Sequence, residues 1–175
     1  MENFIYTKEN CLNKELCNKI IEYFEKNIAI KSKTKSKNCN TMFFSLNSNK
    51  LEFEAKIIKL LKSEIDNYVN LYGRFIAGYN KKEVYANNFF IKKIQKNTKN
   101  GYIPHSLSGD NKLITFVFYL NTVDQEKHDI LVDNINIDPK EGMLLLFPSD
   151  WTFPYQLNSS LNDDKYILKG EIVCV

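Results

Sequence analysis

The chain has 175 residues, of which 43% are hydrophobic and 13% aromatic, so it is long enough for one globular domain with its own core. Its net charge is only +3, and Arg74 is the single arginine among 24 basic residues, which argues against nucleic-acid binding through bidentate arginine contacts. No stretch has the length and apolar character of a membrane span or a secretory signal, so we expect an intracellular, cytoplasmic protein.

A helix is expected near the start of the chain. Apolar residues recur at helical spacing through residues 13–27, and Asn13 is a suitable N-cap. The residues of this face are Leu16, Cys17, Ile20, Ile21 and Phe24. The four cysteines of the chain lack the paired spacing of a zinc or redox site, so we expect them to be reduced packing residues.

Lysines occupy alternate positions from Lys31 to Lys37, directly after this helix. The segment is open to two interpretations, a solvated loop or a lid that contacts an anionic partner. A short strand is expected at residues 41–46.

A second and longer amphipathic helix is predicted over residues 51–73. Gly73 stands where a helix C-cap would be. Its apolar face contains Ile57, Ile58, Leu61, Ile65, Tyr68, Val69 and Tyr72. No heptad repeat continues beyond it, so this helix should pack on its own domain rather than in a coiled coil.

From about residue 86 the sequence becomes rich in short β-strands separated by turn residues. The expected strands fall within residues 87–95, 113–121, 129–137, 142–149 and 165–175. The strand at 113–121 is apolar on both faces, which favours a central place in a sheet. We expect one α+β domain over residues 1–175, with helical support in about 1–85 and a β-sandwich or β-barrel core in about 86–175.

Several pieces of the sequence follow one another in an order known from one enzyme family. They are "FIYTKENCLNKELCNKIIEYFE" at the start, "YIPH" at 102–105, "KLITFVFYLN" at 112–121, "DPKEGMLLLFPSDW" at 138–151 and "KYILKGEIV" at 165–173. Together they resemble the prolyl 4-hydroxylase-like branch of the iron(II)/2-oxoglutarate-dependent dioxygenases. The resemblance implies a double-stranded β-helix (jelly-roll) barrel with two N-terminal supporting helices. It also implies Fe(II) bound by two histidines and a carboxylate, and 2-oxoglutarate bound by a basic residue deeper in the barrel.

Transferred position by position, the resemblance leaves one of three metal ligands in this sequence. His105 takes the first ligand position, but Leu107 stands at the carboxylate position and Tyr155 at that of the second histidine. The resemblance assigns cosubstrate binding to Lys165, ten residues after Tyr155, and to Tyr102. Disturbing even an outer-shell partner commonly weakens metal binding about 10- to 100-fold, so the loss of two direct ligands argues against a working iron site.

Other interpretations of these residues stay open. His105 is equally compatible with a core histidine that is bonded to a backbone carbonyl, and Tyr102 with a buried aromatic side chain. Lys165 follows two aspartates, so it could form a surface ion pair with Asp163 or Asp164 instead of pointing inward.

Substitute metal ligands are few. Asp110 lies five residues after His105, whereas His128 falls in a segment that does not face the metal in the family. Tyr155 would have to bind as a phenolate, which is costly because the phenol pKa is near 10. Phe153 and Tyr155 alternate as in a strand, so they should face the same side and would fill the metal's volume if that side is inward.

Two functions follow from the resemblance. We favour a catalytically inactive or highly atypical dioxygenase-fold protein that acts as a binding or interaction module without a cofactor. Its partner would be a protein, a peptide or a small carboxylate in the old cleft, not nucleic acid or a membrane. The alternative is an active 2-oxoglutarate-dependent oxygenase of the prolyl hydroxylase type, with Fe(II) and 2-oxoglutarate at a non-standard metal site.

Overall fold

The computed structural model describes residues 4–31, 39–43, 52–73, 84–98, 112–124, 129–131, 135–150 and 152–174. Helices and strands alternate in the first half of these residues, and strands alone make up the second half. In chain order the elements are β1 (Tyr6–Lys8), α1 (Lys14–Lys31), β2 (Cys39–Phe43), α2 (Glu52–Tyr72), β3 (Val84–Ile94), β4 (Lys112–Tyr119), β5 (Asp129–Leu131), β6 (Ile135–Ile137), β7 (Leu144–Pro148) and β8 (Lys165–Cys174).

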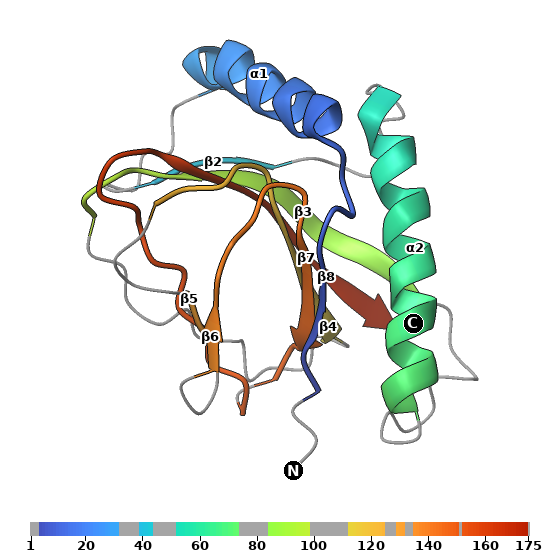
Figure 1. The fold of residues 1–175 in the computed structure, drawn as a ribbon. Helices are drawn as coiled ribbons and strands as arrows, with labels where there is room; N and C mark the ends of the chain where they lie inside the picture. The colour runs from blue at the N-terminus through green and yellow to red at the C-terminus, as the bar shows by residue number, and fades with distance from the viewer. Residues whose placement is uncertain are drawn as a thin grey trace.

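Six strands form one antiparallel sheet in the order β1-β7-β4-β8-β3-β2 (Figure 1). β4 lies between β7 and β8, and its residues from Ile114 to Tyr119 are all buried, as expected for a strand that is apolar on both faces. β1 and β2, which come from the helical half of the chain, form the two edges of this sheet. The division into a helical support and a β core is therefore less sharp than the sequence suggested.

Both helices lie on one side of the curved sheet (Figure 1). Asn13 caps α1, because its side-chain oxygen accepts a hydrogen bond from the backbone N–H of Leu16 at 2.9 Å. Each helix buries side chains spaced three or four residues apart, and these pack against the apolar residues of β4 and β8. The buried helical residues include Cys17, Ile20 and Phe24 from α1, and Ile57, Leu61, Ile65 and Tyr68 from α2.

The end of α2 differs from the prediction. Gly73 does not adopt the left-handed conformation of a glycine C-cap; a Cβ there would instead lie 2.9 Å from Cγ1 of Val69, so the glycine leaves space for that side chain. Among the described glycines, Gly142 has the positive φ, 78°, in the turn before β7. Its N–H donates to the carbonyl of Tyr119 at 2.8 Å, and its carbonyl accepts from the N–H of Leu12 at 3.0 Å. Gly142 therefore links the segment before α1 to the end of β4.

The face of the sheet opposite the helices, called the inner face here, carries a second apolar cluster. Residues of β4, β7 and β8 pack there against Ile137 of β6, so the β5–β6 hairpin covers this face (Figure 1). The predicted combination of two helices with an antiparallel sheet is confirmed, and the arrangement is consistent with a jelly roll. Of the helices within the described parts, neither has the length and apolar character that a bilayer crossing needs.

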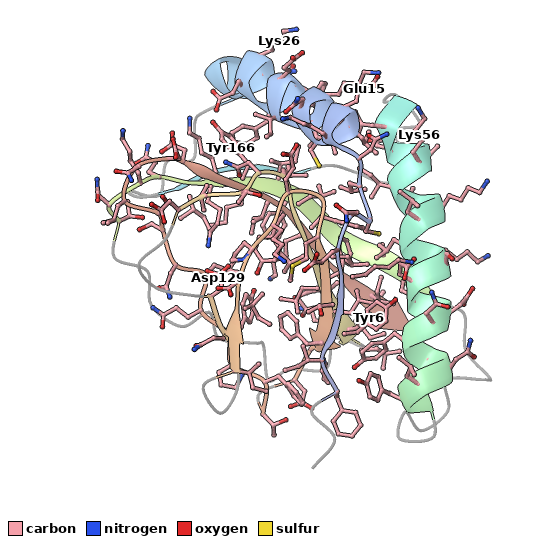
Figure 2. All side chains as sticks on the ribbon, viewed as in Figure 1. Tyr6, Glu15, Lys26, Lys56, Asp129 and Tyr166 are labelled. Atoms are coloured by element: carbon pink, nitrogen blue, oxygen red, sulfur yellow. The ribbon has the colours of Figure 1, made fainter. Side chains whose placement is uncertain are left out.

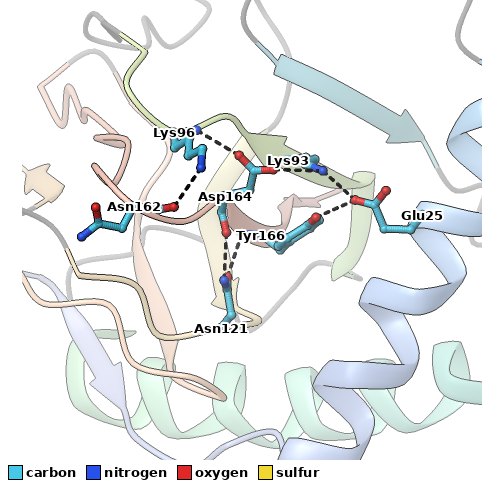
Figure 3. A network of polar contacts seen from close by, with 7 residues as sticks. All are labelled: Glu25, Lys93, Lys96, Asn121, Asn162, Asp164 and Tyr166. Carbon is cyan, nitrogen blue, oxygen red and sulfur yellow. Dashed lines mark hydrogen bonds and ion pairs between the residues drawn. The ribbon is translucent and has the colours of Figure 1, made fainter.

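A polar network fastens α1 to the sheet (Figure 3). Glu25 of α1 accepts hydrogen bonds from the hydroxyl of Tyr166 at 2.5 Å and from Nζ of Lys93 at 2.9 Å, and Lys93 also pairs with Asp164 at 3.1 Å. Asn121 accepts from the backbone N–H of Tyr166 and donates to the carbonyl of Asp164. These contacts fix the start of β8, the strand that carries Lys165.

Candidate functional site

The structure describes two of the residues that the sequence singled out for the site, Lys165 and Tyr155. The other candidates lie outside the described residues, so their roles stay predictions. They are Tyr102, His105, Leu107, Asp110 and His128.

Lys165 begins β8 and is completely buried on the inner face. Its Nζ donates to Oδ1 of Asp129 at 2.6 Å, and the same oxygen accepts the backbone N–H of Asn158 at 2.6 Å. Asp129 is the first residue of β5 and lies between the hairpin and the sheet (Figure 2). Lys165 therefore points inward, and its carboxylate partner is Asp129 rather than Asp163 or Asp164, the surface partners that the sequence left open.

Burial works against both charges of this pair. It lowers the pKa of Lys165, and the neighbouring Asp129 carboxylate only partly restores it. It also raises the pKa of Asp129, despite the opposing effects of Lys165 and of the Asn158 N–H. An ion pair without water needs additional hydrogen bonds to offset the desolvation of both groups. Here one carboxylate oxygen has such support, from Asn158.

The other carboxylate oxygen, Oδ2 of Asp129, is buried and makes no hydrogen bond to the described residues. The buried hydroxyl of Tyr119 is near this carboxylate, but it too lacks a well-formed hydrogen bond within the described parts. Burial and the Asp129 charge raise the pKa of Tyr119 well above its usual value, so it stays a neutral phenol. Sequence reasoning missed both residues, because no local pattern links Asp129 or Tyr119 to Lys165.

Tyr155 is also buried on the inner face. Its ring packs edge-on against Phe147 of β7, with 5.1 Å between ring centroids, and Phe153 packs on the same cluster. Phe153 and Tyr155 therefore share an inward side, as their spacing predicted. Burial raises the pKa of the Tyr155 phenol, so ligation as a phenolate is strongly disfavoured.

A second inward lysine, Lys169, adjoins Tyr155. Its Nζ lies 5.0 Å from the centroid of the Tyr155 ring and 5.6 Å from that of Phe90, and the residue is only 8% exposed. Burial lowers the pKa of Lys169 to about 8, an effect that Glu171 opposes and that the charges of Lys92 and Lys112 strengthen. Sequence reasoning missed this lysine, although it lies four residues after Lys165 and residues at that spacing in a strand share a face.

Comparison with known proteins gives a clear result for structure and none for sequence. The sequence matches no protein-family model and no curated protein. Among solved structures, a truncated viral collagen prolyl hydroxylase from Paramecium bursaria Chlorella virus-1 aligns with a TM-score of 0.70 and 14% identity, over 98% of this chain and 90% of its own. The chain has the fold of a prolyl hydroxylase.

Two further prolyl hydroxylases support this assignment. The enzyme from Trichoplax adhaerens, solved with a hypoxia-inducible factor peptide, aligns with a TM-score of 0.70 and 16% identity over 98% of this chain and 84% of its own. The prolyl-4-hydroxylase of Pseudomonas putida aligns with a TM-score of 0.67 and 12% identity over 98% and 93%. The predicted resemblance to prolyl 4-hydroxylases is thus confirmed, and at these identities what the structures share is the fold.

Tyr155 and Lys165 are the described residues that bear on whether iron and 2-oxoglutarate could be held here. Within these parts of the chain, no three His, Cys, Asp or Glu side chains gather into a metal-binding group. Tyr155, at the position that the resemblance assigns to the second histidine, contacts the ring of Phe147 and the ammonium of Lys169, and a nearby cation opposes binding of Fe(II). The charge of Lys165 is already neutralised by Asp129.

Proposed function

We propose that this protein is a binding module on a prolyl hydroxylase fold, and that it does not perform the oxidation of its structural neighbours. Its two sheets would form the jelly-roll barrel that the resemblance implies, with the ligand held against the inner face. One observation carries the proposal. The lysine that the resemblance assigns to the cosubstrate is buried against a carboxylate of the protein itself, at 2.6 Å.

This internal carboxylate competes directly with 2-oxoglutarate. In the implied mechanism, the lysine would pair with the far carboxylate of the cosubstrate. In this chain Asp129 already makes that kind of contact, and the Asn158 N–H holds the same oxygen in place. A tethered group acts at an effective concentration of about millimolar or higher, so a free dicarboxylate has to displace a partner that is always present.

The metal side of the site supports the same conclusion. Tyr155 is buried and aromatic, and the Lys169 ammonium lies over its ring at 5.0 Å. Replacing a metal ligand with a packed aromatic side chain fills the volume that the ion and its water would need. The inner face would then be a preformed site for a ligand rather than a site for oxidation.

The proposal is tested by metal titration under anaerobic conditions. The purified chain is treated with chelator, titrated with Fe(II) or Mn(II) in a calorimeter in the presence of 2-oxoglutarate, and then assayed in air for succinate. We expect neither metal uptake at micromolar concentrations nor succinate release. Micromolar uptake together with succinate release that depends on 2-oxoglutarate would overturn the proposal.

The second candidate is an active 2-oxoglutarate-dependent oxygenase with a non-standard metal site. It is favoured by the fold of its neighbours, one of which, the viral enzyme, was solved as a 2OG complex. It is also favoured by the inward direction of Lys165. This candidate requires the Lys165–Asp129 pair to separate when the cosubstrate enters. Exchange of Asp129 for asparagine should then raise the affinity for 2-oxoglutarate and increase succinate release.

A further inference from the structure

Among the described residues, four lysines lie on the inner face of the sheet, on three adjacent strands. β8 contributes Lys165 and Lys169, which share a face with Ile167 because they alternate along the strand. Lys92 of β3 is opposite Ile167 in the register, so it lies between the two lysines of β8. Its neighbour two residues on, Ile94, packs in the inner cluster, which confirms the direction.

The fourth lysine, Lys112, begins β4 and pairs with Glu171 of β8 at 3.2 Å. Both side chains are about one-seventh exposed, 15% and 13%, so this end of the inner face reaches solvent. Asp129 neutralises Lys165 at the other end. Among the described residues of the inner face, these four lysines are accompanied by two carboxylates, Asp129 and Glu171, which leaves a net charge of +2.

The two remaining lysines are Lys92 and Lys169. In the described part of the chain neither has a carboxylate partner, and the contacts of the Lys169 ammonium are the ring faces of Phe90 and Tyr155. A cation–π contact offsets only part of the cost of burying an ammonium. Like charges on neighbouring strands add repulsion. The described part of the inner face therefore leaves this positive charge undercompensated.

We propose that a small oxyanion, a carboxylate or a phosphate, binds between Lys92 and Lys169 on the inner face. Lysine ammonium groups bind such anions as point charges, and the rings of Phe90 and Tyr155 form apolar walls beside them. Lys112 and Glu171 lie at the partly exposed end, where the ligand would enter. This inference rests on the proposed role as a binding module and names the class of its ligand. The site differs from the cosubstrate position at Lys165, which Asp129 occupies.

The test is a thermal melt of chelator-treated, metal-free protein with inorganic phosphate, succinate or sodium chloride at one ionic strength. Phosphate or succinate at about ten times its Kd should raise the Tm by about 3 °C or more above chloride. Lys169→Met should abolish the rise and Lys92→Gln should reduce it. Lys59→Gln, on the exposed face of α2, should retain it. The anion that raises the Tm, phosphate or succinate, shows whether the site takes a phosphate or a carboxylate.

The stability of the variants in chloride also shows whether a lost Tm shift comes from a damaged fold instead of a lost anion site. Lys169→Met should be at least as stable as the wild type in chloride, because it removes an uncompensated buried charge and keeps a similar shape. The proposal is overturned if neither anion shifts the Tm, or if the shift is the same in Lys169→Met. Because these melts contain no metal, their outcome is independent of the succinate assay. The anion site can therefore be contradicted while the proposed lack of oxidation stands, and the lack of oxidation can be contradicted while the anion site stands.

Discussion

At the scale of single residues, the decisive feature is the built-in counter-ion of Lys165. Asp129 is 36 residues away in sequence, and only the fold brings the two together at 2.6 Å. Sequence reasoning could identify the lysine, because it sits in a recognisable strand. It could not identify the carboxylate, because no local pattern links residue 129 to residue 165. The inward direction of Lys169 was overlooked, although it follows from that of Lys165 by alternation along the strand.

Asp129→Ala should destabilise the protein by about 3–5 kcal/mol, because it leaves the Lys165 ammonium buried without its partner. The measurement is urea unfolding at neutral pH. Formate or acetate should restore part of the loss, since either ion can enter the space left by the carboxylate. Asp163→Ala, which removes an exposed carboxylate, is the matched control. An Asp129→Ala protein as stable as this control would show that the pair contributes nothing to stability.

The stability difference between Lys169→Met and the wild type should depend on pH. The pKa of Lys169 is lowered to about 8 in the folded protein, so between this value and the ordinary lysine pKa the unfolded chain binds more protons. Wild-type stability relative to the variant should therefore rise as the pH increases from 8 to about 10.5. Urea midpoints of both proteins across this range give the answer. A constant difference would mean that Lys169 is not desolvated.

At the scale of elements, the helices were the most predictable part of the structure. Apolar residues at helical spacing and the N-cap Asn13 predicted α1, and a longer apolar face predicted α2. Both were predictable because a helix that packs on a sheet must bury a regular face. The prediction at Gly73 was wrong because a glycine after a helix has two uses, and here it makes room for Val69. The attachment of β1 to α2 could not be predicted, since it depends on one buried carboxylate far along the chain.

That carboxylate is Glu64, which accepts hydrogen bonds from Tyr6 and Lys8 at 2.6 Å each. Although burial raises its pKa, these bonds outweigh the effect and hold the pKa of Glu64 below its ordinary value. Its stabilising effect is thus present above the unfolded pKa and is lost as the pH falls through the folded one. Glu64→Gln should cost about 2 kcal/mol at pH 7 and much less near pH 3, measured by urea unfolding. Glu22→Gln, at an exposed site on α1, is the matched control and should leave the stability at pH 7 nearly unchanged.

At the scale of the whole molecule, most of the element order was predictable although the sequence matches no family model, but residues 129–137, expected as one strand, contain two, β5 and β6. Identities of 12–16% to prolyl hydroxylases of the same fold show why. Strand periodicity and turn positions persist when most side chains change, whereas the residues that bind a metal or a ligand need not persist. That the chain forms one domain stays a prediction, as do the roles of Tyr102, His105 and Leu107, which lie outside the described residues.

The alignment of the metal positions can be tested by rebuilding them. Leu107→Asp with Tyr155→His should bind Fe(II) or Mn(II) poorly while the Lys169 ammonium stays beside position 155. Adding Lys169→Met should allow metal uptake at micromolar concentrations in calorimetry. His105→Ala in this triple variant is the control and should remove the uptake. Equal, negligible binding by the double and triple variants would contradict the assignment of Tyr155 to the second ligand position.

Lys165 and Tyr166 are consecutive residues of β8, and they face opposite sides of the sheet. The polar network between α1 and the sheet in Figure 3 and the buried Lys165–Asp129 pair are therefore attached to the same peptide unit. Since the two side chains share one peptide unit, a displacement of α1 that shifts Tyr166 would also shift the backbone that carries Lys165.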